Sequence, residues 1–321
     1  MTTVRTPAAL TVRQQRRADR RRADLEATDR GILSVFDWRT RRVRGGMLLA
    51  HVFLFAGLVV AGLGPILWLV KAAFTSTTDT LQTPLAFFPN GIVFDNVIAA
   101  FTVEHIDKYF LNSVIMAAGS WAVQLIVATT AGFVLSVLRP RYAPVLNALI
   151  LATLFIPSVV LLVPLFLTIL HPGGIGPNLL NTWWAVWLPA GANAFNVLLV
   201  KRFFDNLPRE VFEAARTDGA GPLRLFFSIV LPMSKPILGV ISVFAIIASW
   251  KDYLWPLLVL PPRAGNDLQP LSVRLPAIQP TTDLGVLLAC LAIATVIPII
   301  LFLLFQRVFL QGGGLGGAVK G

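Results

Sequence analysis

Six long apolar segments separated by polar stretches constrain the fold of this chain more than any other feature. Each approaches the roughly 20 residues that a helix needs to cross a hydrocarbon core of about 30 Å. Lipid offers the backbone no hydrogen-bond partners, and the strand alternation of a membrane barrel is absent. The sequence therefore predicts an all-α integral membrane protein with six transmembrane helices, kinked at internal prolines, at residues 47–70, 110–138, 146–169, 182–200, 236–260 and 284–309.

The composition supports a membrane protein and argues against a nucleic-acid partner. Only 13% of the residues are charged, against about 25% in a soluble domain. The formal net charge is +11, but twelve of the 27 Lys and Arg lie in residues 1–46. We divide the chain into an Arg-rich cytoplasmic tail, 1–46, and a six-helix domain, 47–321. Two interpretations of the tail remain open: a solvated segment that sets the topology, or one that lies on anionic membrane lipid.

The distribution of basic residues predicts the orientation of the helices. Cytoplasmic loops of membrane proteins carry an excess of Lys and Arg. With the N-terminus inside, the cytoplasmic segments 1–46, 139–145 and 201–235 hold 20 of them, whereas the external loops 71–109, 170–181 and 261–283 hold four. We predict that both termini are cytoplasmic. The long external loop 71–109 is either a small folded cap or a plain connector.

The cytoplasmic loop 201–235, between the fourth and fifth helices, has the pattern of a helical hairpin. Pro208 suits a helix start, with Glu210 near the positive end of the helix dipole. Gly219 and Gly221 are expected to stop this helix, because glycine tolerates a left-handed backbone. A second helix over residues 222–231 follows, with Pro232 ending it. Its apolar residues recur at helical spacing: Leu223, Phe226, Phe227 and Val230.

The same loop resembles the EAA signature of permease subunits of binding-protein-dependent ABC importers. The matching pattern is Glu213-Ala214-Ala215, then Gly219, then Ile229, and finally Leu231-Pro232. Four other stretches resemble the carbohydrate (maltose-type) branch of that family: Asn112-Ser113, residues 157–166, residues 249–257 and the terminal residues 314–321. Lys251 stands where that branch usually has Asn.

The resemblance implies a mechanical role and a set of partners. The loop would lie in a groove of a cytoplasmic ATPase and transmit its closure to the helices. Implied partners are a second, related permease, two ATPase subunits that carry ATP and Mg²⁺, and an extracytoplasmic substrate-binding protein, in a bacterial-type plasma (inner) membrane. The ATPase-coupling residues implied are Glu213, Ala214, Ala215, Asp218, Gly219, Gly221, Leu231 and Pro232.

Polar residues inside the apolar segments are the candidates for the solute pathway, because charge within a span is costly. In the fifth segment these are Lys251 and Asp252 with three flanking aromatic residues, Trp250, Tyr253 and Trp255. Aromatic faces beside polar groups suit a sugar, but an interfacial aromatic belt with a snorkelling lysine explains the same residues. In the fourth segment they are Asn193 and Asn196, for which hydrogen bonding between helices is the alternative.

No motif for covalent chemistry or for binding ATP occurs in this chain. It lacks the phosphate loop Gly-x-x-x-x-Gly-Lys-Ser/Thr, and its three histidines are not at metal-ligand spacing. We therefore expect a transport subunit that is not an enzyme and holds no cofactor or metal of its own. The expected function is alternating-access import of a sugar or polyol-type solute. The alternative is a stand-alone, ion-coupled secondary transporter, which predicts inverted repeats and buried coupling carboxylates.

Overall fold

A computed structural model describes residues 41–86, 90–263 and 265–312, and all regular structure within those ranges is helical. The chain divides into two units, residues 1–68 and 69–321, which we describe separately. Most of the predicted N-terminal tail and the terminal stretch 314–321 lie outside the described residues.

The first unit contains most of helix α2 (Arg41–Ala73), which includes Pro65. Its apolar residues are spread around the whole helix and are largely exposed; Phe53, for example, is 79% exposed. A helix that is apolar on every side is suited to lipid or to a protein interior. The first predicted segment is thus confirmed as a single long helix.

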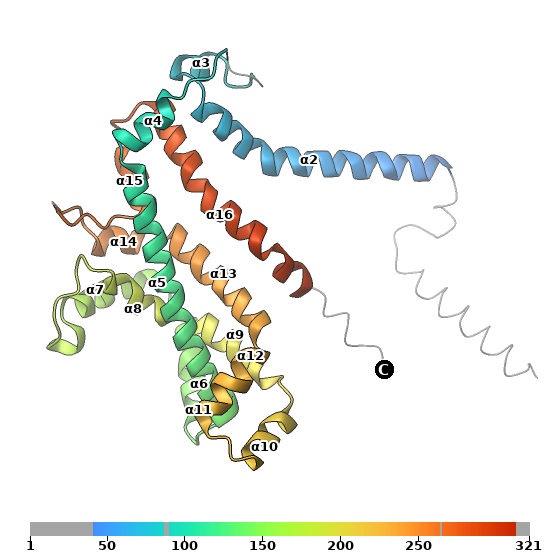
Figure 1. Cartoon of the computed structure of the whole chain (residues 1–321), viewed down its shortest axis with the longest axis vertical. Coiled ribbons are helices and arrows are strands. Elements are labelled where there is room, and N and C mark those ends of the chain that lie inside the picture. The colour runs from blue at the N-terminus through green and yellow to red at the C-terminus, as the bar shows by residue number, and fades with distance from the viewer. Residues whose placement is uncertain (1–40, 87–89, 264, 313–321) are drawn as a thin grey trace, which may run out of the picture. The chain divides into compact units, whose positions relative to one another are not determined.

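Helix α5 (Ile106–Phe133) is the centre of the second unit and matches the second predicted segment. It packs against α8 (Trp184–Gly191), α9 (Ala194–Asp205) and α13 (Lys235–Lys251), which come from segments far apart in the chain (Figure 1). A π-helical turn, Val134–Leu138, continues α5. The backbone of Arg139 then adopts a left-handed conformation, with φ 47°, and ends it.

The third predicted segment is a broken helix. Helix α6 (Ala143–Thr153) is followed by a 3₁₀ turn (Ser158–Leu161) and by α7 (Leu162–Leu170), and the two parts meet at a bend of 102°. Pro157, at the bend, lacks a backbone N–H, and the residue before a proline avoids the helical conformation. The third segment was expected to be a kinked helix; the chain instead turns by 102° between two separate helices.

The fourth predicted segment is also two helices, α8 and α9, separated by Ala192 and Asn193. Pro189, inside α8, provides no N–H to the carbonyl of Ala185. The indole Nε1–H of Trp255 donates to that carbonyl instead, at 3.0 Å. Asn193 then begins α9 by accepting a hydrogen bond from the backbone N–H of Asn196 at 3.0 Å.

The fifth predicted segment begins as expected at a proline-containing first turn but breaks near its end. Helix α13 ends at Lys251, Asp252 is extended, and α14 (Leu254–Val259) follows. The hydroxyl of Ser272 donates to the Asp252 carbonyl at 2.6 Å. One continuous helix would have kept Lys251 and Asp252 on adjacent faces. The break after Lys251 instead gives Asp252 an extended backbone.

The sixth segment is confirmed as one helix, α16 (Leu284–Gly312), which includes Pro298. The stretch predicted as an external loop contains α3 (Thr77–Gln82) and α4 (Asp95–Thr102), and both pack against α16. Asn96, buried in α4, donates to the Thr75 carbonyl at 2.8 Å. This stretch is thus a folded cap. Helix α15 (Leu271–Ile278) also packs on α5 and α16.

Three helical stretches within the described residues are long and apolar enough to cross a membrane: Gly45–Ala73, Ile106–Leu138 and Leu284–Leu301. Two bent pairs of helices reach that length together, Ala143–Thr153 with Ser158–Gly174 and Pro222–Met233 with Lys235–Lys251, which raises the number to five. The all-helical architecture is confirmed, and the count of six spans stays a prediction.

Candidate functional site

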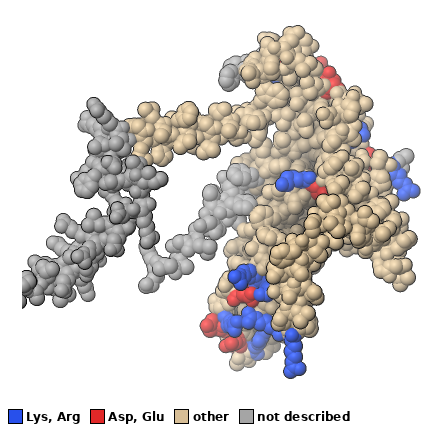
Figure 2. Space-filling view, turned by 180° about the vertical axis from the view of Figure 1, so that it is seen from behind, with Lys and Arg blue, Asp and Glu red and all other residues tan. Residues whose placement is uncertain are grey.

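The polar stretch after α9 folds into a helical hairpin, as predicted. Pro208 precedes α10 (Arg209–Thr217), whose first turn contains Glu210. After a short turn, helix α11 (Pro222–Leu225) continues through a π-helical turn, Phe226–Val230, into α12 (Leu231–Met233). Figure 2 shows acidic and basic side chains gathered at the end of this unit where α10 and α11 lie in Figure 1.

Gly219 ends α10 with the left-handed conformation that was predicted, with φ 78°. Its N–H donates to the Arg216 carbonyl at 3.0 Å, and the N–H of Ala220 donates to the Ala215 carbonyl at 2.9 Å. These two bonds form a Schellman motif, which satisfies carbonyls that the end of a helix leaves without partners. The turn between the two helices is therefore fixed by backbone hydrogen bonds.

Two details of the predicted hairpin are wrong. Gly221 does not stop the first helix; it precedes the second one in an extended conformation, with φ −72° and ψ 168°. Pro232 lies inside the second helical stretch, which ends at Met233. The π-helical turn changes the register, and the hydroxyl of Ser234 donates to the Val230 carbonyl at 2.6 Å. A proline is tolerated here because it lies in the first turn of the short helix α12.

The apolar face of the second helix also differs from the prediction. Leu225, Phe226 and Val230 are buried, whereas Leu223 is 75% and Phe227 62% exposed. The buried face packs with Phe212 of α10 into a cluster formed by α5 and α9 residues, including Phe133, Val200 and Phe204. Burial of several large side chains, each worth about 1.5–3 kcal/mol, holds the hairpin firmly on the helices.

The implied ATPase-coupling residues lie mainly on the exposed side of this hairpin. Glu213, Ala214, Asp218, Gly219, Gly221 and Pro232 are exposed, and Ala215 and Leu231 are partly buried. A Cβ atom added to Gly219 or Gly221 would meet nothing within 4 Å. The hairpin therefore presents a surface of small and charged residues above a buried face that packs on α5 and α9.

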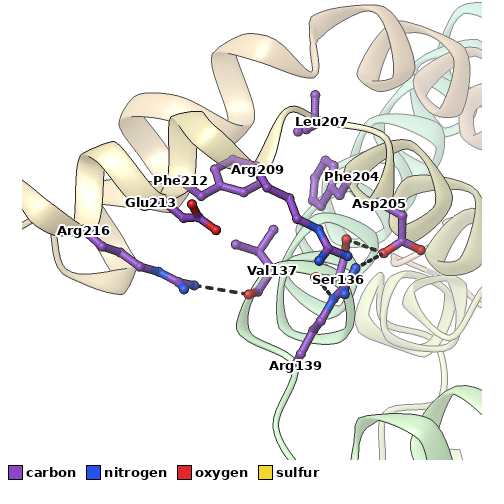
Figure 3. A pocket seen from close by; sticks show the side chains of 10 residues that line it. All are labelled: Ser136, Val137, Arg139, Phe204, Asp205, Leu207, Arg209, Phe212, Glu213 and Arg216. Atoms are coloured by element: carbon purple, nitrogen blue, oxygen red, sulfur yellow. Dashed lines mark hydrogen bonds and ion pairs between the residues drawn. The ribbon is translucent and has the colours of Figure 1, made fainter.

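A small cavity of about 180 Å³ separates α10 from the end of α5 (Figure 3). Glu213 and Arg216 line it from α10, together with Arg209. The guanidinium of Arg216 donates to the Val137 carbonyl, in the π-helical turn, at 3.3 Å. This bond joins the hairpin directly to the end of α5.

Asp205, at the end of α9, lies on the other side of this cavity and joins three donors. It accepts hydrogen bonds from Ser136 at 2.8 Å and Arg139 at 3.1 Å, both from the end of α5, and from Lys201 at 2.7 Å. Burial disfavours its ionised form, but these donors outweigh burial and hold the pKa of Asp205 below its ordinary value of 3.8. Asp205 therefore stays charged and fixes the end of α5 against α9.

Sequence reasoning missed this ionic cluster. Lys201 and Asp205 stand four residues apart, a spacing that pairs charges on one helix face and was readable from the sequence. Ser136 and Arg139 lie 69 and 66 residues away from Asp205. No local pattern connects positions that far apart.

A second cavity, of about 370 Å³, is lined by α5 and by residues of the three broken segments, the third, fourth and fifth. It brings together three of the predicted solute-pathway residues, Asn193, Asp252 and Trp255. Its other polar lining residues are Ser120 and Gln124 of α5, Ser158 of the 3₁₀ turn and Ser249 of α13. The hydroxyls of Ser120 and Ser249 are buried and have no hydrogen-bond partner among the described residues, which makes them available to a polar ligand.

The other predicted solute-pathway residues do not line this cavity. Trp250 packs edge-on against Phe110, with ring centroids 5.8 Å apart, and Lys251 and Tyr253 are exposed. Asn196 donates to Gln124 at 2.8 Å in a buried bond between α9 and α5. Gln124, Ser120 and Ser249 were not among the predicted residues, although each is a polar residue inside an apolar segment.

The described residues contain no group of three or more His, Cys, Asp and Glu that could hold a metal ion. Hydrogen-bonding and charged groups line both sites.

Comparison with known proteins matches residues 124–312 to a family described as the inner membrane component of binding-protein-dependent transport systems. The arabinooligosaccharides transport system permease protein AraQ of Halalkalibacterium halodurans is 33% identical over 83% of this chain and 94% of its own length. The diacetylchitobiose uptake system permease protein NgcG of Streptomyces coelicolor is 30% identical over 81% and 84%.

A third relative, the sn-glycerol-3-phosphate transport system permease protein UgpE of Salmonella typhi, is 29% identical over 84% of this chain and 96% of its own length. In fold, the chain is similar to a solved bacterial ABC transporter chain involved in alginate import, with a TM-score of 0.71 over 84% of this chain and 98% of that one, at 23% identity.

The family match, over residues 124–312, covers the hairpin site and all of the second cavity's lining except Ser120. The relatives are permease subunits rather than stand-alone ion-coupled transporters. The chain therefore belongs to the family of inner membrane components of binding-protein-dependent transport systems, as a permease subunit.

Proposed function

We propose that this permease subunit forms half of the translocation pathway for a sugar or polyol-type solute, with six transmembrane helices and both termini in the cytoplasm. The relatives named for arabinooligosaccharides, diacetylchitobiose and glycerol phosphate support this solute class. The excess of Lys and Arg in the predicted cytoplasmic segments supports the orientation. The hairpin then faces the cytoplasm, and the cap formed by α3 and α4 faces outward.

The observation that carries this proposal is the hairpin itself. Its buried face is fixed to α5 and α9, and its exposed face displays Glu213, Ala214 and Asp218. Alanine and glycine at the surface allow another protein to approach the backbone closely. We assign this face to contact with a cytoplasmic ATPase, which binds ATP and Mg²⁺, so that closure of the ATPase pair moves the hairpin.

Helix α5 transmits movement of the hairpin to the second, larger cavity, in which the solute would bind. Arg216 binds the Val137 carbonyl, and Asp205 binds Ser136 and Arg139, so both contacts act on one end of this helix. Ser120 and Gln124, further along α5, line the larger cavity. A shift or rotation of α5 would therefore alter the polar lining of the cavity in step with the hairpin.

The larger cavity has the chemistry that a hydroxyl-rich solute requires. Asp252 and Asn193 offer hydrogen-bonding groups at the ends of broken helices, an arrangement that other transporters use at their binding sites. The indole of Trp255 adds an apolar surface on which a sugar ring packs. The remaining partners in the proposed assembly are a second permease and an extracytoplasmic binding protein that delivers the solute.

Reconstitution of the complete complex in proteoliposomes tests the proposal. Uptake should require ATP on the side of the membrane that the ATPase subunits face and the solute-loaded binding protein on the opposite side. Ala214→Arg, on the exposed face of α10, should abolish co-purification of the ATPase, whereas Ala277→Arg, on an exposed position of α15, should retain it. Uptake by this chain alone, without ATP, would refute the proposal.

A further inference from the structure

A third cavity, of about 350 Å³, lies beside the hairpin between the end of α5, the start of α6 and α9. Three basic residues line it: Arg139, Arg141 and Lys201. None of the implied ATPase-coupling residues and none of the solute-pathway candidates contributes to it. It is therefore a separate site with a strongly positive lining.

The positive charge of this cavity is only partly compensated. Arg139 and Lys201 share one carboxylate, that of Asp205, at 3.1 Å and 2.7 Å. Arg141 is exposed and forms no ion pair within the described part of the chain. Three cations thus face a single acid, which favours an anionic ligand.

Arg139 is held in place before any ligand arrives. Its backbone N–H donates to the Val134 carbonyl at 2.9 Å, and its side-chain Nε–H donates to the Ser136 carbonyl at 2.5 Å. These bonds fix a left-handed residue at the end of the π-helical turn. Its remaining guanidinium donors are pre-organised, and a guanidinium matches the geometry of a phosphate group.

Apart from the amide of Asn147, the other walls of the cavity are apolar, and they continue along one side of α6. Leu135, Ala143 and Pro144 line the cavity. Further along the same side of α6, Ala148 and Leu151 are exposed, and Leu151 is 46% exposed. A basic cavity that opens onto an exposed apolar strip matches a ligand with a charged head and hydrocarbon tails.

We propose that this cavity binds the phosphate headgroup of an anionic phospholipid of the cytoplasmic leaflet, with the acyl chains lying along α6. The assignment rests on the orientation proposed above, which places residues 139–145 at the cytoplasmic surface. Basic pockets between helices on this side of a membrane are suited to anionic lipid headgroups. Since Arg139 also lines the cavity under α10, the bound lipid supports the contact between α5 and the hairpin.

The test compares lipid retention by the purified complete complex. Complexes are exchanged into nanodiscs of phosphatidylglycerol and phosphatidylcholine, washed with detergent and measured by native mass spectrometry. Wild type should retain phosphatidylglycerol over phosphatidylcholine. Arg141→Gln should weaken retention about fivefold, and Arg141→Gln with Lys201→Gln should weaken it further. Arg202→Gln, next to Lys201 on α9 but outside the cavity, is the matched control and should behave as wild type.

Three outcomes would overturn the lipid assignment. Equal loss in Arg202→Gln would mean that general surface charge retains the lipid. Equal retention of the two lipids would exclude recognition of the anionic headgroup. Displacement of the lipid by inorganic phosphate at millimolar concentration would identify a free-phosphate site. Co-purification of the ATPase is recorded in the same samples, so that failure of the lipid site is distinguished from failure of the proposed assembly.

Discussion

At the scale of single residues, two glycines of the same sequence motif, Gly219 and Gly221, differ in whether the backbone requires glycine. Gly219 has φ 78°, in the left-handed region, whereas Gly221 has φ −72°. Neither has an atom within 4 Å of the position that a Cβ would occupy. Steric room is thus the same at both positions, and only the backbone conformation of Gly219 requires glycine.

Gly219→Ala should therefore impair the hairpin, and Gly221→Ala should not. A left-handed conformation costs a non-glycine residue about 1–2 kcal/mol, which corresponds to a factor of roughly 5–30 in an equilibrium. The measurement is solute-stimulated ATP hydrolysis by the complete complex. Equal losses in both variants would show that contact with the partner, rather than the backbone, makes these glycines necessary.

Asp205→Asn should destabilise the second unit at neutral pH by about 1–2 kcal/mol, because bonds to a charged group are worth more than neutral ones. The folded-state pKa of Asp205 lies below the ordinary value of 3.8. Its contribution is therefore complete above that value and is lost as the pH falls through the lower folded pKa.

Thermal unfolding in detergent, followed from neutral pH to below the ordinary Asp205 pKa of 3.8, tests this dependence. The difference between wild type and Asp205→Asn should shrink only at the acidic end. Asp107→Asn, an exposed acid in the first turn of α5, serves as the control. A constant difference over the whole range would contradict the role given to the Asp205 carboxylate.

At the scale of elements, the apolar segments could be predicted from the sequence and the breaks inside them could not. Length and hydropathy identify a segment, and Pro157 and Pro189 indicate where a helix is weak. Whether a proline bends or interrupts a helix depends on which other group donates a hydrogen bond to the carbonyl four residues earlier, because proline has no N–H to donate. At Ala185 that partner is Trp255, 70 residues away.

The bond between Trp255 and Ala185 gives a double-mutant test of this explanation. Trp255→Phe should leave the buried carbonyl unpaired and cost about 1–3 kcal/mol. Adding Pro189→Ala restores a backbone N–H to the same carbonyl and should recover part of that loss. Unfolding of the three variants in detergent measures the coupling, and strictly additive effects would contradict the explanation.

The break after α13 separates two residues that the sequence places side by side. Asp252 lines the larger cavity, whereas Lys251 is exposed and outside it. Asp252→Asn should therefore raise the KM for uptake by several-fold, consistent with the loss of a charged hydrogen bond. Lys251→Gln should leave KM unchanged. The reverse pattern in proteoliposome uptake would remove Asp252 from the solute pathway.

At the scale of the whole molecule, the family pattern and the charge distribution yielded more predictions than the local signals for single helices and turns did. The conclusion that the chain is an all-helical permease subunit followed from segment lengths and from the signature over residues 213–232. The contacts that connect the hairpin to the helices did not follow, because Ser136, Arg139 and Asp205 meet only in the folded chain. The cavity residues Ser120 and Ser249 are brought together in the same way.

Site-specific photocrosslinking tests the central claim, that the exposed face of α10 contacts the ATPase. A photoreactive amino acid is placed at Ala214 in the complete complex, and a second variant carries it at Asn266, in the predicted external loop. Our account predicts a crosslink to the ATPase from position 214 that changes in yield when ATP is bound, and none from position 266. Absence of an ATPase crosslink from position 214, in a complex that still imports solute, would contradict it.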